Sequence, residues 1–81
     1  MRVTVRLFAR LRELAGHETF AVDVPDSATV ADVWTQVTTA HPALAPFGRA
    51  ISVAVNADFA RMTSPVRDAD DVAFLPPVSG G

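Results

Sequence analysis

The 81-residue chain has no cysteine and no lysine, and only four glycines. Without cysteine it has no disulfide, no cysteine-ligated zinc and no thiol chemistry, so a small domain must hold together by packing alone. All seven basic residues are arginine. Genomic base composition explains that bias most simply, but it has a chemical consequence: no side chain here can receive an isopeptide bond.

Charge and hydropathy exclude further classes of protein. The net charge of −2 gives no basic surface for nucleic acid. The longest apolar run is far too short to span a membrane. Residues 1–6 alternate as a strand does and do not resemble a signal peptide, so we expect a cytoplasmic protein. With 49% hydrophobic residues, the chain predicts one folded domain that leaves apolar surface for a permanent partner.

The first third of the chain predicts two strands around a short helix. Residues 2–8 alternate, with the side chains at 3, 5 and 7 on one face and those at 2, 4, 6 and 8 on the other. Residues 9–15 predict a short helix that Gly16 ends. Residues 19–24 alternate again. The two strands are close enough in sequence to pair antiparallel.

The main helix is expected at about residues 29–41. Thr29 and Asp32 have the spacing of a capping box, and Pro42 ends the helix. An apolar stripe with helical spacing follows the cap and predicts packing on a sheet, at Val30, Val33, Trp34 and Val37.

The remainder predicts a loop at 43–48, strands at 51–56, 59–62 and 72–75, and turns at 56–58 and 68–71. The order ββαββ, with short connections, indicates an α+β protein of the β-grasp, ubiquitin-like type. We expect a mixed sheet of four to five strands on one main helix. Residues 1–75 form this domain, and residues 76–81 form a flexible Gly-Gly tail.

No residue pattern predicts a catalytic or metal site of the chain's own. His17 and His41 lack ligand spacing and are better interpreted as surface or capping residues. The serines have no histidine and aspartate arranged as in a triad. Asp70 and Asp71 fit a solvated turn near an arginine better than a catalytic pair. We therefore expect no metal and no cofactor bound by this chain.

The C-terminal tail is the part of the sequence that indicates a chemical function. Pro76 and Pro77 stop ladder pairing and stiffen the exit from the last strand, and Val78-Ser79-Gly80-Gly81 follows. A frayed end is the simplest interpretation. However, glycines can enter a narrow channel and approach phosphates closely, and the last residue offers a free carboxylate that a partner's ATP site could adenylate. The resulting anhydride is open to attack by sulfur or nitrogen. Because cysteine is absent, this carboxylate is the one group that could carry sulfur.

Four segments, at residues 8–16, 28–33, 53–56 and 71–81, follow one another in order along the chain, and the most specific is the ending Phe-Leu-Pro-Pro-Val-Ser-Gly-Gly. Together these segments resemble the small, sulfur-carrying subunit of molybdopterin synthase, of the MoaD/ThiS-like family. The resemblance implies a β-grasp fold and a non-catalytic subunit of a heterotetramer with the large synthase subunit. It also implies that an ATP-dependent enzyme adenylates Gly81 and converts it to a thiocarboxylate. The resemblance further implies that this group donates its sulfur to cyclic pyranopterin monophosphate in molybdenum cofactor biosynthesis.

Two positions depart from the family pattern. Ala69 replaces a glycine that could take positive φ, so we expect this turn to adopt another type. Leu75 stands where an aromatic residue is also common. Strand parity directs Ala73 and Leu75 outward beside Phe8, with Arg6 at the rim, and we predict a partner interface from these four residues.

Two alternatives share the tail chemistry. One is a related sulfur carrier for thiamine or another sulfur pathway. The other is a ubiquitin-like modifier or interaction protein without a sulfur role. The absence of lysine argues against chain building by such a modifier, although it allows single conjugation.

Overall fold

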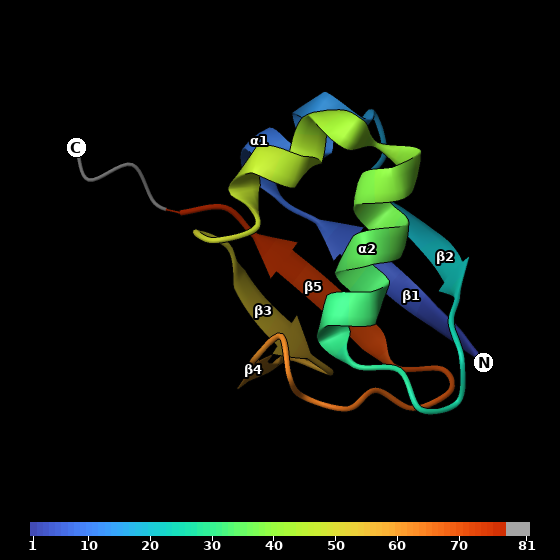
Figure 1. Cartoon of the computed structure of the whole chain (residues 1–81). Coiled ribbons are helices and arrows are strands. Elements are labelled where there is room, and N and C mark those ends of the chain that lie inside the picture. The colour runs from blue at the N-terminus through green and yellow to red at the C-terminus, as the bar shows by residue number, and fades with distance from the viewer. Residues whose placement is uncertain (78–81) are drawn as a thin grey trace.

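The computed structural model describes residues 1–77 and shows a five-stranded mixed sheet with its helices on one face (Figure 1). The strands are β1 (Arg2–Leu7), β2 (Thr19–Asp23), β3 (Ser52–Val55), β4 (Asp58–Ala60) and β5 (Asp71–Leu75). The helices are α1 (Ala9–Ala15), α2 (Val30–Ala40) and the 3₁₀ helix η1 (Pro42–Phe47). The prediction of an α+β fold with one main helix is confirmed. Within these residues, no helix has the length and apolar character needed to cross a membrane.

The sheet order is β2-β1-β5-β3-β4, so β5 lies at its centre. β1 pairs antiparallel with β2, as the sequence predicted, and parallel with β5. β3 pairs antiparallel with both β5 and β4. A parallel pair needs a long crossover, and here the chain between β1 and β5 includes α2, which crosses one face of the sheet (Figure 1).

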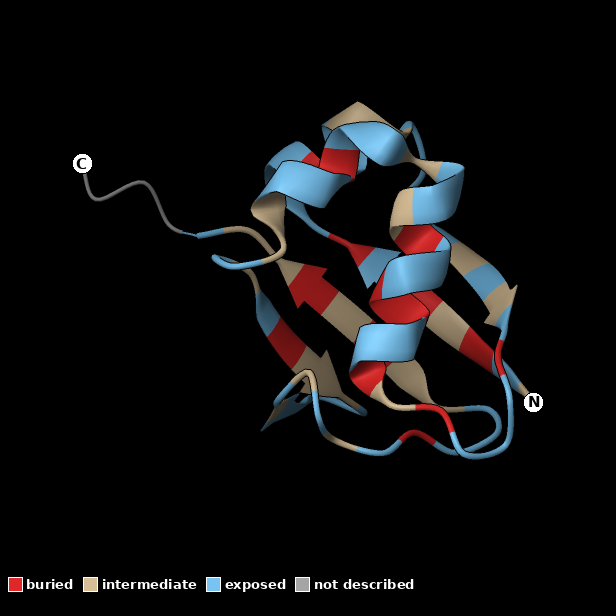
Figure 2. Ribbon diagram, in the orientation of Figure 1, coloured by how far each residue is buried: buried red, intermediate tan, exposed pale blue. Residues whose placement is uncertain are grey.

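The core lies between α2 and this face of the sheet (Figure 2). The predicted helix stripe is fully or almost fully buried, and Trp34 packs on Phe74 of β5 with ring centroids 4.9 Å apart. The Asp32 carboxylate accepts a hydrogen bond from the Thr29 backbone N–H at 2.8 Å, as the capping box predicts. Since α2 contains several threonines with low helix propensity, this packing is its main source of stability.

The structure corrects three sequence predictions. Residues 42–47 form a 3₁₀ helix rather than a loop, because proline at its first position needs no N–H partner and Leu44 is buried. β4 covers residues 58–60 instead of 59–62. Ala69 has a φ of 70°, so the turn takes the positive φ that alanine was expected to avoid.

Candidate functional site

The chain leaves the domain from the central strand of the sheet. β5 is paired with β1 as far as Phe74 and with β3 as far as Leu75, so the strand is held on both sides up to the residue before the one at which it ends. Pro76 is half-buried and Pro77 exposed. The predicted sulfur attachment site Gly81, and the predicted access residues Val78, Ser79 and Gly80, lie outside the described residues.

One face of the sheet is not covered by a helix, and we call it the open face. Its middle row joins four strands by register, from Arg6 through Ala73 and Ala54 to Phe59. Val72 and Phe74 of β5 are fully buried, whereas Ala73 and Leu75 are half-buried. This difference confirms the parity prediction that placed Ala73 and Leu75 outward.

Phe8 lies at the edge of the open face. It is not in β1, which ends at Leu7, but is the N-cap of α1 with an extended backbone. Leu7 pairs with Phe74 in parallel register, so Phe8 and Leu75 are the two residues that follow this last paired position. Phe8 is 42% exposed. Its role in a partner interface, together with Arg6, Ala73 and Leu75, stays a prediction.

Phe59 is the functional candidate that the sequence did not reveal. It is 88% exposed and sits on β4 directly across from Ala54. Alternation over 59–62 could not place it, because β4 is only three residues long and its register depends on the turn at residues 56–57. An aromatic residue this exposed beside a row of alanines indicates a contact surface.

Ion pairs lie on the part of the open face that surrounds β1. Arg6 pairs with Asp71 through Nε and Oδ2 at 2.6 Å, which agrees with the predicted arginine near the acidic turn. Asn56 donates to the Asp70 carboxylate and accepts from the Asp71 N–H, both at 2.9 Å. These contacts fix the turn before β5 and hold Arg6 beside Ala73.

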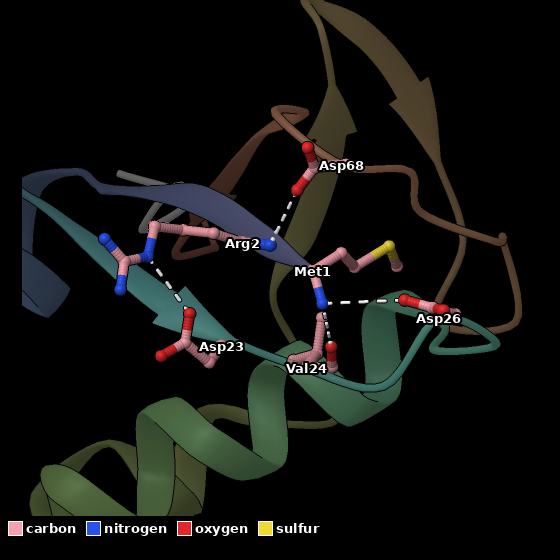
Figure 3. A network of polar contacts seen from close by, with 6 residues as sticks. All are labelled: Met1, Arg2, Asp23, Val24, Asp26 and Asp68. Carbon is pink, nitrogen blue, oxygen red and sulfur yellow. Dashed lines mark hydrogen bonds and ion pairs between the residues drawn. The ribbon is translucent and has the colours of Figure 1, made fainter.

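Arg2 and Asp23 form a second cross-strand pair at 3.0 Å. The hydrogen bond from Arg2 and the attraction of its positive charge lower the pKa of the Asp23 carboxyl. The same hydrogen bond raises the pKa of Arg2. Figure 3 shows this pair next to the amine of Met1.

The two histidines lie together although they are far apart in sequence. The ring centroids of His17 and His41 are 5.9 Å apart, and each ring is near Phe20, at 6.2 Å and 5.5 Å. The three rings form an aromatic cluster at the end of α2. Within residues 1–77, no three acidic, histidine or cysteine side chains gather as a metal site, and no pocket is present.

Residues 5–81 match the ThiS family. The chain belongs to the ThiS family. A molybdopterin synthase sulfur carrier subunit of Chlamydomonas reinhardtii is 35% identical to it, over 100% of both chains. The small archaeal modifier protein 1 of Haloferax volcanii is 40% identical, over 94% of this chain and 97% of its own.

Solved structures place this ThiS family member among ubiquitin-like β-grasp proteins. The crystal structure of SAMP1 from Haloferax volcanii has a TM-score of 0.88 at 36% identity, with 100% of both chains covered. A chain in the crystal structure of the Amycolatopsis orientalis BexX/CysO complex has a TM-score of 0.72 at 28% identity, covering 98% of this chain and 99% of its own. The predicted β-grasp fold is confirmed, and at least one similar chain has been crystallised in a protein complex.

Proposed function

We propose that this ThiS family protein is the sulfur carrier subunit of a molybdopterin synthase. The observation that carries the proposal is the ending Phe-Leu-Pro-Pro-Val-Ser-Gly-Gly on the central strand of a β-grasp domain. Full-length similarity to a molybdopterin synthase sulfur carrier subunit supports it. The chain contributes no catalytic residue; it presents its tail to enzymes that load and unload it.

The proposed chemistry takes place at Gly81. Its carboxylate attacks the α-phosphate of ATP in an activating enzyme, and pyrophosphate leaves. Hydrosulfide then attacks the carbonyl carbon of the acyl adenylate, AMP leaves, and the new S–H group loses its proton. The product is a thiocarboxylate, whose sulfur the large subunit transfers to cyclic pyranopterin monophosphate. ATP is bound by the activating partner and not by this chain.

The open face is proposed as the docking surface for the large subunit. Phe8 and Leu75 lie at the base of the tail, and Phe59 extends the apolar surface across Ala54 to β4. Arg6 is already neutralised by Asp71, so the partner needs an apolar surface here rather than an acidic one. Docking on this face keeps the partner beside the point where the tail leaves the sheet.

A sulfur transfer assay tests the function. The chain is purified from cells that contain its activating enzyme, and its intact mass is measured. We expect one oxygen at Gly81 to be replaced by sulfur, and we expect molybdopterin to form when the large subunit and the pterin precursor are added. A variant lacking Gly81 is the control and should remain unmodified at nearly unchanged thermal stability. A thiocarboxylated chain that forms no molybdopterin with its large subunit contradicts the proposal and favours another sulfur pathway.

The second candidate function is protein modification. The relative at 40% identity is a small archaeal modifier protein, and an acyl adenylate at Gly81 reacts with amines as well as with sulfur. Amide conjugates between Gly81 and lysines of other proteins, found by mass spectrometry of cell extracts, would support this function. The two functions share the activation step and differ only in the acceptor.

A further inference from the structure

We propose that the outer edge of β2 is a self-association site, at which a second copy of this chain adds its own β2 in antiparallel register. The two sheets then join into one, across a two-fold axis at Ala21. This site does not depend on the proposed chemistry at Gly81. It is defined by the backbone groups and side chains that the edge of β2 presents.

β2 is the outermost strand of the sheet on the side opposite β4 (Figure 1). At one end of the strand the Leu7 N–H donates to the Glu18 carbonyl at 2.8 Å. At the other end the Val24 N–H donates to the Met1 carbonyl at 2.9 Å. Because bonded and non-bonded pairs alternate in an antiparallel ladder, the even-numbered residues of this segment bond to β1. The backbone groups of the odd-numbered residues therefore point away from the sheet, at Thr19, Ala21 and Asp23.

These outward groups have no backbone hydrogen-bond partner within residues 1–77, and all three residues are exposed. Proteins usually protect such an edge with lysine, proline, a bulge or a very short strand. β4 is protected in this way, since it has three residues and the following Arg61 N–H donates to the Ser64 hydroxyl at 3.0 Å. β2 has five residues in regular register, and Arg2 pairs with the carboxylate of its Asp23. The edge of β2 can therefore accept another strand.

A second copy of β2 complements this edge in one register. When Ala21 faces Ala21 of the second copy, Thr19 of each copy faces Asp23 of the other. All the outward N–H and C=O groups of both strands are then paired, and the Thr19 hydroxyl can donate to the facing Asp23 carboxylate. A shift by two residues leaves some of these groups unpaired. A shift by four in one direction places the two Asp23 side chains opposite each other, which is unfavourable.

The side chains on the covered face match in the same register. Phe20 and Val22 are half-buried and pack at the margin of the core. Phe20 of each copy then faces Val22 of the other, and pairs of an aromatic with a β-branched side chain stabilise sheets. The joined sheet thus buries apolar surface that a single copy leaves partly exposed. Because each copy contributes one strand, the interface is small and the dimer is of the transient kind that forms at high protein concentration.

This arrangement keeps the proposed working parts of each copy accessible. A two-fold axis perpendicular to the joined sheet leaves both open faces on the same side and both β4 edges at the outer ends. The β5 strands of the two copies run in opposite directions, so the two chains leave their sheets at opposite ends. Self-association through β2 is therefore compatible with docking of a partner on either copy.

Sedimentation equilibrium at rising protein concentration tests the site. We expect the unsubstituted chain to show a monomer–dimer equilibrium. Ala21→Glu and Ala21→Arg each place like charges opposite each other at the axis, and each should weaken dimerisation about fivefold. An equal mixture of these two variants should associate at least as strongly as the unsubstituted chain, because opposite charges then face each other. Gln36→Glu, on the solvent side of α2, adds the same charge as Ala21→Glu and should leave dimerisation unchanged.

A chain that stays monomeric up to about 1 mM overturns the inference and leaves this edge to a strand of another protein. Dimerisation that is unaffected in both Ala21 variants overturns it as well, because the copies then associate elsewhere. Weakened dimerisation that the mixture does not restore contradicts the register with Ala21 at the axis.

Hydrogen exchange in the unsubstituted chain tests the same site without a substitution. The amides of Thr19, Ala21 and Asp23 should become protected as the protein concentration rises, because they are bonded in the dimer alone. The amides of Phe20 and Val22 are bonded to β1 in every copy and should be protected at all concentrations. Nuclear magnetic resonance resolves these five amides separately. Exchange of the three outward amides that does not change with concentration overturns the inference.

Discussion

The two faces of the sheet are built from the same strands but differ in nearly every physical property. The covered face contributes large side chains that are almost fully buried against α2, from Val3, Val5, Leu7, Val53, Val72 and Phe74. The open face carries alanines, cross-strand ion pairs and the exposed Phe59. Because side chains alternate along each strand, two neighbouring residues of a strand lie on opposite faces of the sheet. The covered face should determine stability, and the open face should determine binding.

The largest expected effect comes from Phe74 on the covered face. Phe74→Ala leaves a cavity beside Trp34 and should cost about 3–5 kcal/mol in the free energy of unfolding. Urea denaturation followed by Trp34 fluorescence measures it. The matched control is Leu75→Ala, one residue further along β5, where we expect a loss of less than about 1 kcal/mol. Similar losses for both variants would remove the distinction between the two faces.

The open face is tested by binding. Phe59→Ala should weaken association with the large subunit about tenfold, because exposed aromatic residues often become buried anchors in an interface. Its free energy of unfolding should change by less than about 0.5 kcal/mol. Calorimetric titration gives the affinity. Gln36→Ala, on the solvent side of α2, is the control and should bind as the unsubstituted chain does. Unchanged affinity for Phe59→Ala would limit the interface to the residues around Leu75.

The turns belong to neither face and allow stability to be raised without altering binding. Ala57 and Ala69 have φ angles of 71° and 70°, a conformation that disfavours any side chain with a Cβ. Ala57→Gly and Ala69→Gly should therefore each stabilise the fold by about 0.5–1 kcal/mol. Ala54→Gly, in the regular part of β3, is the control and should destabilise it by a similar amount. Thermal unfolding measures the stability of all three variants. A loss of stability in both turn variants would contradict the inference that alanine is strained at these two positions.

Local patterns predicted most of the covered face. Alternation identified β1, β2, β3 and β5, and the stripe beginning at Val30 identified α2, because burial against one partner surface imposes a period on the sequence. The capping box could also be predicted, because Thr29 and Asp32 contact each other within one turn of the helix. The antiparallel pairing of β1 with β2 followed from their short connection.

The features that were missed depend on contacts between distant segments. Ala69 keeps its positive φ because the surrounding turn is fixed to β1 and to Asn56: its N–H donates to the Arg2 carbonyl, and Asn56 bonds the next two residues of the turn. Phe59 reaches the open face only through the register of a three-residue strand. The contacts of the Met1 nitrogen with Val24 and Asp26 likewise require β2 to be in place. No local pattern encodes these pairings.

The smallest expected effect is a pH dependence of the free energy of unfolding that comes from the Arg2–Asp23 pair on the open face. The pKa of Asp23 is lowered by Arg2 in the folded state, so the folded chain binds fewer protons there than the unfolded chain. The pairing thus contributes to stability above the ordinary value of 3.8, and this contribution is lost as the pH falls below 3.8 through the lower folded-state pKa. Asp23→Asn should be slightly less stable than the unsubstituted chain at neutral pH and should lose less stability on acidification. Urea denaturation above and below this pH measures the difference, which salt should reduce because both side chains are exposed. If both chains lose the same amount of stability on acidification, the Arg2–Asp23 pair contributes charge to the open face but no stability.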